Sequence, residues 1–124
     1  MKYPVVHFEV MGKDPDALQA FYGGAFDWQF APATGAGGAE YRFAGTQATG
    51  GINGGIGAMA GYDGHVTFYV LVPSLEAMLA RVEELGGSTL VAPSPASATT
   101  RVALFRDPEG HVVGLVEERS EGQS

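Results

Sequence analysis

The strongest constraint on the fold is an internal repeat. Residues 5–30 align without a gap with residues 65–90, and residues further along each half align at nearly the same offset. The matched pairs are Val6/Val66, Phe8/Phe68, Val10/Val70, Ala17/Ala77, Ala20/Ala80, Arg42/Arg101, Gly55/Gly114. Self-similarity over this length indicates that one supersecondary unit is built twice and that each copy buries an apolar face.

Each copy opens with a strand in which apolar and polar residues alternate, VVHFEV in the first and HVTFYV in the second. A helix follows each strand. Asp14 with Pro15 predicts the start of the first helix, and Ser74 predicts the start of the second, because both are favoured N-cap residues. The glycine pairs at 23–24 and 86–87 predict the helix ends, where a left-handed residue is commonly needed.

The order of elements is therefore βαβββ, twice. We expect strands near residues 5–11, 28–31, 40–45, 51–59, 65–72, 89–92, 100–106 and 111–117, and loops at 32–39 and 93–98. The predicted fold class is α+β, with two βαβββ modules forming a cup-shaped mixed sheet and the helices on its outer face.

The predicted organisation is a single domain over residues 1–124. Its modules cover about 4–60 and 64–118, and a short polar tail covers 119–124. A ligand pocket is expected where the two modules face each other.

The composition and charge of the chain limit the classes of partner that it can bind. The net charge of −7 opposes nucleic-acid binding, which depends on Lys and Arg. No apolar run is long enough to span a membrane, and the N-terminus lacks the pattern of a secretory signal, so we expect a cytoplasmic protein. The sequence has no cysteine, so any metal ligands would be His, Asp or Glu.

Four segments resemble the vicinal-oxygen-chelate superfamily, which includes glyoxalase I, bleomycin-resistance proteins and extradiol dioxygenases. They are VVHFEV, DPDALQAFY followed by FDW, GGINGGIG and DPEGHVVGLVE. Their order is similar to that in a glyoxalase-like subgroup without a settled function, and the resemblance covers nearly the whole chain. It implies the same α+β fold and a homodimer.

In the metal-dependent members of this superfamily, four ligands come from equivalent positions of the two modules. The resemblance places these positions at Val5, Gly55, His65 and Gly114. Only His65 has a donor side chain, and one imidazole does not hold a divalent ion against water. We therefore expect no cofactor, no metal-dependent glyoxalase I activity and no extradiol dioxygenase activity. The glycine run GGINGGIG is expected to leave room in the cup.

Strand alternation predicts which side chains line the cup, because residues two apart share a face. Phe8, Val10, Phe68 and Val70 should pack beneath the helices. The candidate ligand-binding residues on the other face are His7, Glu9, Asn53, His65, Thr67, Tyr69.

Two classes of function fit these residues. The first is binding of a small molecule in the cup without a metal. The alternative is an enzyme of the lyase or isomerase type that acts on a small oxygenated metabolite. Its candidate catalytic residues are His7 and Glu9, by acid–base chemistry, or its chemistry would use one divalent ion held by the displaced set of His7, Glu9 and His65.

Three other residues invite a functional reading that we do not favour. His111 is expected to stabilise the turn that contains DPEG. Tyr22 and Trp28 are expected to pack in the core, since aromatic residues near the end of an amphipathic helix usually do so.

Overall fold

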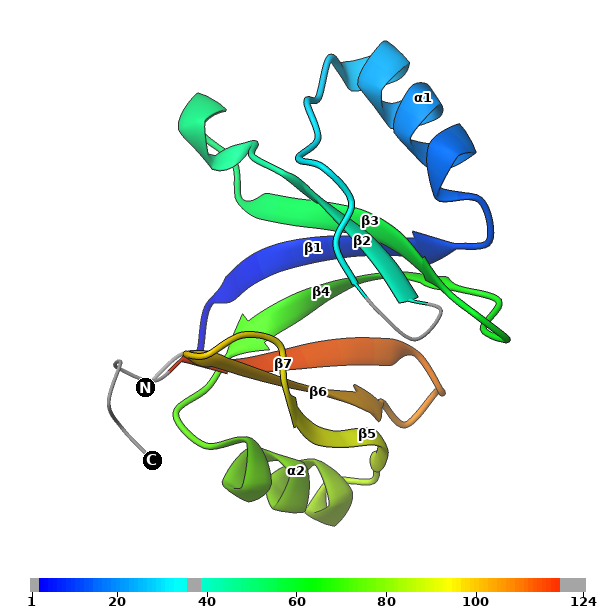
Figure 1. Cartoon of the computed structure of the whole chain (residues 1–124). Coiled ribbons are helices and arrows are strands. Elements are labelled where there is room, and N and C mark those ends of the chain that lie inside the picture. The colour runs from blue at the N-terminus through cyan, green and yellow to red at the C-terminus, as the bar shows by residue number, and fades with distance from the viewer. Residues whose placement is uncertain (1–2, 36–38, 119–124) are drawn as a thin grey trace. The chain divides into compact units, whose positions relative to one another are not determined.

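A computed structural model describes residues 3–35 and 39–118 (Figure 1). The described residues form seven strands, two α-helices and one short 3-10 helix, which is an α+β fold. They divide into two compact units, one covering Val6–Thr67 and the other containing the residues up to Val5 and from Phe68 onward. In this part of the chain, no helix is both long enough and apolar enough to cross a membrane.

The unit Val6–Thr67 carries a mixed sheet in the order β2-β3-β1. β1 pairs in parallel with β3, and β2 pairs antiparallel with β3. The elements are β1 (Val5–Gly12), α1 (Pro15–Phe26), β2 (Ala39–Ala44), η1 (Gln47–Thr49), β3 (Asn53–Met59) and the first residues of β4 (His65–Leu71).

Strand register assigns the two faces of this sheet. Phe8 lies beside Gly54 and Val10 beside Ile56 on one face, and the Phe8 ring contacts Trp28, just after α1, at a centroid distance of 5.1 Å. His7 and Glu9 therefore lie on the opposite face. The predicted division of β1 into a helix face and a polar face is confirmed.

The second unit contains the remainder of β4, α2 (Leu75–Glu84), β5 (Ser88–Pro95), β6 (Thr100–Arg106) and β7 (Val112–Glu118), with strand order β4-β7-β6-β5. Figure 1 shows α2 against these strands. A compact apolar core holds helix and sheet together, formed by Val72, Leu75, Leu79, Ala103, Leu115. Val70 packs on this core as predicted, whereas the prediction for Phe68 is wrong, because its side chain is 43% exposed.

Both helix starts are confirmed. The Asp14 carboxylate accepts from the Ala17 amide at 3.1 Å, and the Ser74 hydroxyl accepts from the Ala77 amide at 3.2 Å. Gly86 takes the predicted left-handed conformation, with φ of 103°. The glycines at 23–24 lie near the end of α1 but do not supply its left-handed residue: the helix continues to Phe26, and Asp27 takes that conformation with φ of 61°.

Two strand predictions are corrected. Residues 28–31 do not form a strand, and only Phe30 makes an isolated bridge, to Ala44. Pro32 has no amide hydrogen, so a strand ladder cannot continue there. Pro93–Pro95 of the predicted loop 93–98 instead extends β5, whose pairing with β6 is irregular. Part of the predicted loop 32–39 and the tail 119–124 lie outside the described residues.

His111 has the predicted role in its turn. Its Nδ1 lies 2.9 Å from Asp107 Oδ2, and its backbone amide donates to Asp107 Oδ1 at 2.9 Å. The backbone amide hydrogen bond from His111 is the main cause that lowers the pKa of Asp107, against the opposing effect of desolvation.

Candidate functional site

Five side chains of the unit Val6–Thr67 gather into what we call the polar cluster: His7, Glu9, Tyr41, Tyr62, His65. β1 supplies the first two, β2 supplies the third, and the turn before β4 and its first residue supply the others. The cluster brings together three of the candidate residues named from the sequence.

Glu9, His65 and Tyr62 form a chain of short hydrogen bonds. Glu9 Oε2 lies 2.6 Å from His65 Nε2, and His65 Nδ1 lies 2.5 Å from the Tyr62 hydroxyl. The side chains of Glu9 and His65 are each less than a tenth exposed. A carboxylate can only accept, so His65 Nε2 donates to Glu9, and in the neutral imidazole Nδ1 then accepts from the tyrosine. This arrangement orients the Tyr62 hydroxyl through a buried acid–imidazole pair.

His7 forms a second histidine–tyrosine pair. Its Nε2 lies 2.8 Å from the Tyr41 hydroxyl, and the two rings are stacked at a centroid distance of 6.2 Å. Desolvation by burial lowers the pKa of His7, and the charge of Glu9 opposes this shift. His7 is therefore neutral near pH 7, and it can donate from one ring nitrogen and accept at the other.

A tyrosine ring covers each of the two glycines at the superfamily's ligand positions. A Cβ on Gly55 would lie 2.3 Å from the Tyr41 ring, and a Cβ on Gly114, in the other unit, would lie 2.5 Å from the Tyr69 ring. The expectation that the run GGINGGIG leaves open room is thus wrong at Gly55, because aromatic carbon fills the space.

The residues at the superfamily's ligand positions do not fit a divalent metal. Val5 and the two glycines have no donor, and both ring nitrogens of His65 are hydrogen-bonded, to Glu9 and to Tyr62. Across residues 3–35 and 39–118, no three His, Asp or Glu side chains are arranged so that they could hold a metal ion. The displaced set is divided: His65 lies against Glu9, whereas His7 pairs with Tyr41.

The other candidate residues lie outside the polar cluster. The Asn53 side chain binds Gln47, accepting from its backbone amide at 3.0 Å, so it fixes η1 at the start of β3. Thr67 is buried in β4. Tyr69 is buried in the other unit, where its ring covers Gly114.

Two cluster members were not predicted from the sequence, Tyr41 and Tyr62. Tyr62 lies in a turn, where strand alternation gives no direction for a side chain, although it comes only three residues before His65. Tyr41 shares a strand face with Phe43, and its position could have been inferred from the alternation of β2. What the sequence does not give is the pairing register that sets Tyr41 opposite Gly57 and lays its ring over Gly55.

An open groove of about 520 Å³ reaches the polar cluster at Tyr62. Its walls include Met59 at the end of β3 and the charged side chains of Lys13, Glu40 and Asp63. Lys13 and Asp63 are 3.2 Å apart and highly exposed, so their ion pair contributes little stability. The groove gives a small molecule a route to the Tyr62 ring.

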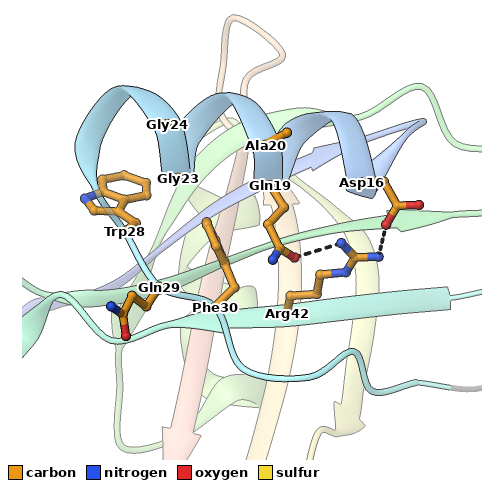
Figure 2. Close-up of a pocket in the computed structure, with 9 residues that line it drawn as sticks. All are labelled: Asp16, Gln19, Ala20, Gly23, Gly24, Trp28, Gln29, Phe30 and Arg42. Atoms are coloured by element: carbon orange, nitrogen blue, oxygen red, sulfur yellow. Dashed lines mark hydrogen bonds and ion pairs between the residues drawn. The ribbon is translucent and has the colours of Figure 1, made fainter.

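A second open groove, of about 540 Å³, lies between α1 and β2 (Figure 2). Figure 2 shows Asp16 and Gln19 reaching from the helix to Arg42 on the strand. Trp28 lies at one end of the groove and packs against other aromatic residues, including Tyr22 at a ring-centroid distance of 5.8 Å. Both residues are only half-buried, so the prediction that they lie in the core is wrong.

Comparison with solved structures gives several matches at low sequence identity. A hypothetical protein from Bacillus halodurans C-125 has a TM-score of 0.72 at 15% identity, with 100% of both chains covered. Methylmalonyl-CoA epimerase from Mycobacterium tuberculosis has a TM-score of 0.69 at 15% identity, covering 94% of this chain and 88% of the epimerase. These likenesses show a shared fold.

A Streptomyces coelicolor methylmalonyl-CoA epimerase variant in complex with 2-nitronate-propionyl-CoA has a TM-score of 0.62 at 16% identity, covering 94% of this chain and 97% of the epimerase. No curated protein matches the sequence. The family model of the glyoxalase-like domain matches residues 7–116, which is most of the chain. The chain therefore belongs to the glyoxalase-like domain family, within the vicinal-oxygen-chelate superfamily whose motifs it carries.

Proposed function

We propose that this protein binds a small oxygenated molecule at the polar cluster without a metal ion. The observation that carries the proposal is the chain from Glu9 through His65 to Tyr62, which uses both nitrogens of the one histidine left at the superfamily's ligand positions. The cluster offers hydroxyl and imidazole groups, which suit hydroxyl, carbonyl or carboxylate oxygens of a ligand.

The local packing supports this proposal. Tyr41 covers Gly55, so the surface at that position is an aromatic ring with a hydroxyl rather than an anionic ligand for a cation. Phe43 is 51% exposed and lies 4.9 Å from the Tyr41 ring centroid, which adds an apolar surface beside the polar groups. An apolar wall with a few fixed polar groups is typical of sites for small organic molecules.

A thermal-shift screen tests the proposal. The panel consists of small hydroxy-acids, oxo-acids and acyl-CoA thioesters, with methylmalonyl-CoA among them. At least one compound should raise the Tm of the wild type, because a ligand that binds only the folded state stabilises it. The shift should be lost in His7→Ala and Tyr62→Phe and kept in Glu109→Gln, whose side chain is outside the cluster. Equal shifts in all four proteins would contradict the proposal.

A second candidate is proton transfer, as in an isomerase. The observation that favours it is the buried Glu9–His65 pair, since an acid–imidazole pair beside a hydroxyl can accept and return a proton. The related folds of methylmalonyl-CoA epimerases suggest the test reaction. In D₂O, an active protein would exchange the C2 hydrogen of methylmalonyl-CoA for deuterium, and Glu9→Gln would abolish the exchange. Binding without exchange would leave only the first candidate.

We also propose that the protein is a cytoplasmic homodimer, as its resemblance to the superfamily implies. Large exposed apolar side chains support a protein interface, among them Val66 at 75% and Phe21 at 64% exposure. Light scattering coupled to size-exclusion chromatography should give twice the chain mass of 12.9 kDa. A mass of one chain at micromolar concentration would contradict the dimer.

A further inference from the structure

The groove between α1 and β2, hereafter the α1–β2 groove, has features that the polar cluster does not explain. We define it by six of its lining residues: Gln19, Gly23, Gly24, Trp28, Phe30, Arg42. Arg42 and Tyr41 are neighbours on β2, so their side chains lie on opposite faces of the sheet. The α1–β2 groove is therefore separate from the polar cluster.

The internal repeat shows what this position holds when it is only structural. Gln19 of α1 aligns with Leu79 of α2 at the offset of 60 residues. Leu79 is 7% exposed and belongs to the core of its unit. Gln19 instead carries a polar amide at the same helical position and lines a hollow. In the first copy of the repeat, this helical position therefore lines a polar groove, whereas in the second copy it makes a core contact.

Two glycines widen the hollow on its helix side. Gly23 lies one turn after Gln19 on the same helix face, and a Cβ there would approach the Trp28 carbonyl oxygen and the Phe30 ring. No atom of residues 3–35 or 39–118 lies within 4 Å of a Cβ added to Gly24, so packing among these residues does not require a glycine there. Each glycine inside a helix lowers stability relative to alanine. The α2 positions that align with them carry Glu83 and Glu84.

The polar groups of the groove select against anions. Arg42 uses all of its guanidinium hydrogens internally, donating to Glu40, Asp16, Gln19 and the Pro15 carbonyl. Two carboxylates therefore already neutralise this cation. Gln19 accepts from Arg42 at 2.8 Å through its Oε1, which leaves its amide NH₂ group as a donor toward the groove.

We propose that the α1–β2 groove binds an uncharged planar molecule with a ring carbonyl, such as an aromatic lactam. The Gln19 amide donates to the carbonyl, and the ring packs against the side chains of Phe30 and Trp28 that line the groove (Figure 2). The volume of about 540 Å³ is within the range of small-molecule sites. This site is independent of the proposed function at the polar cluster.

The test uses quinolin-2(1H)-one as the probe and quinoline-2-carboxylate as its anionic counterpart. The chain has a single tryptophan, so one indole N–H signal in a ¹H–¹⁵N NMR spectrum reports directly on Trp28. The lactam should shift this signal and the Gly23 amide signal saturably, with Kd on the order of 1 mM for a ligand of this size. The carboxylate should bind at least about tenfold more weakly, because Arg42, the cation among the groove residues that the structure describes, is already neutralised by Glu40 and Asp16.

Variants separate the groove from nonspecific binding. Gln19→Leu introduces the residue type found at the aligned position of α2 and removes the amide donor. Gly23→Ala adds a methyl group beside the same groove. Each should weaken binding of the lactam about tenfold or more, whereas Glu84→Ala, an exposed position on α2, should leave Kd unchanged. Absence of a saturable Trp28 shift, equal binding of the carboxylate, or unchanged Kd in both groove variants would overturn the proposal.

Discussion

Tyr41 and Gly55 show how two residues change the chemistry of one position in a fold. The tyrosine ring lies where a side chain at residue 55 would begin, and His7 holds its hydroxyl. The two residues depend on each other: any side chain at residue 55 must displace the Tyr41 ring, and loss of the ring would leave a cavity above the glycine.

Gly55→Ala should therefore destabilise the fold. The new Cβ would lie 2.3 Å from the Tyr41 ring, so the ring must move and its hydrogen bond to His7 must weaken. We expect a loss of about 1–3 kcal/mol in the free energy of unfolding, measured by urea denaturation, as for other overpacked sites.

Gly45→Ala is the matched control, because no atom of the residues that the structure describes lies within 4 Å of an added Cβ at that position. Its free energy of unfolding should stay within about 0.5 kcal/mol of the wild type, as is usual at surface positions. Equal stability of Gly55→Ala and Gly45→Ala would show that Tyr41 does not fill the glycine position.

Asp107 links stability to pH at the turn before β7. Its pKa is lowered from the usual 3.8, so the folded state releases the proton more readily than the unfolded state. The stabilising contribution of the ionised Asp107 to the free energy of unfolding is present above pH 3.8 and is lost as the pH falls through the lowered pKa. Asp107→Asn should be less stable than the wild type at neutral pH, and this difference in stability should be smaller at about pH 3. Thermal unfolding across this range measures the difference, and a constant difference would contradict it.

Single residues were predictable where a periodic element fixes them. The alternation of β1 put His7 and Glu9 on one face, and the structure confirms that face. The same alternation gave no information about Tyr62, because its direction depends on the turn that joins β3 to β4. Its hydrogen bond to His65 is a tertiary contact with no periodic signature.

At the scale of elements, α1 and α2 begin alike and end differently. Both N-caps follow from Asp14 and Ser74, whose side chains bond the third amide of each helix. The glycines at 23–24 were a misleading signal for the end of α1, since the helix passes through them to Phe26. Asp27 ends it instead, and a non-glycine residue in that conformation is uncommon enough to escape prediction.

Gly24→Ala should stabilise α1. The added methyl group meets no atom of the described part of the chain within 4 Å, and alanine restricts the unfolded chain more than glycine does. We expect a gain of about 0.5–1 kcal/mol in the free energy of unfolding, seen as a higher Tm by circular dichroism. A loss of stability would show that the helix backbone at residue 24 is packed more closely than the structure indicates.

Strand existence was harder to predict than helix starts. Residues 28–31 have the composition of a short strand, but Phe30 alone pairs with Ala44 before Pro32 interrupts the ladder. In the second copy, β5 continues through two prolines to Pro95. Its pairing with β6 is irregular, so it does not depend on the amide hydrogens that proline lacks. Both errors come from proline at strand edges.

For the whole molecule, the repeat in the sequence was enough to predict the α+β fold. It also gave the βαβββ order of the second copy, whereas the first copy has one strand fewer, because residues 28–31 form no strand. Glycine at positions 55 and 114, where the resemblance places metal ligands, can be read directly from the sequence. The groups that fill the space above these glycines have no such signature. The tyrosines over Gly55 and Gly114 come from strands at different positions of the repeat, β2 for Tyr41 and β4 for Tyr69. In each copy a tyrosine ring therefore fills the space above the glycine, but it comes from a different strand.

The most direct test of the account is the metal content of the purified protein after expression with added zinc, nickel and iron. Inductively coupled plasma mass spectrometry should find far less than one ion per chain after dialysis, because Glu9 and Tyr62 occupy both nitrogens of His65 and Tyr41 covers Gly55. One firmly held ion per chain, lost in His65→Ala or Glu9→Ala, would contradict the account.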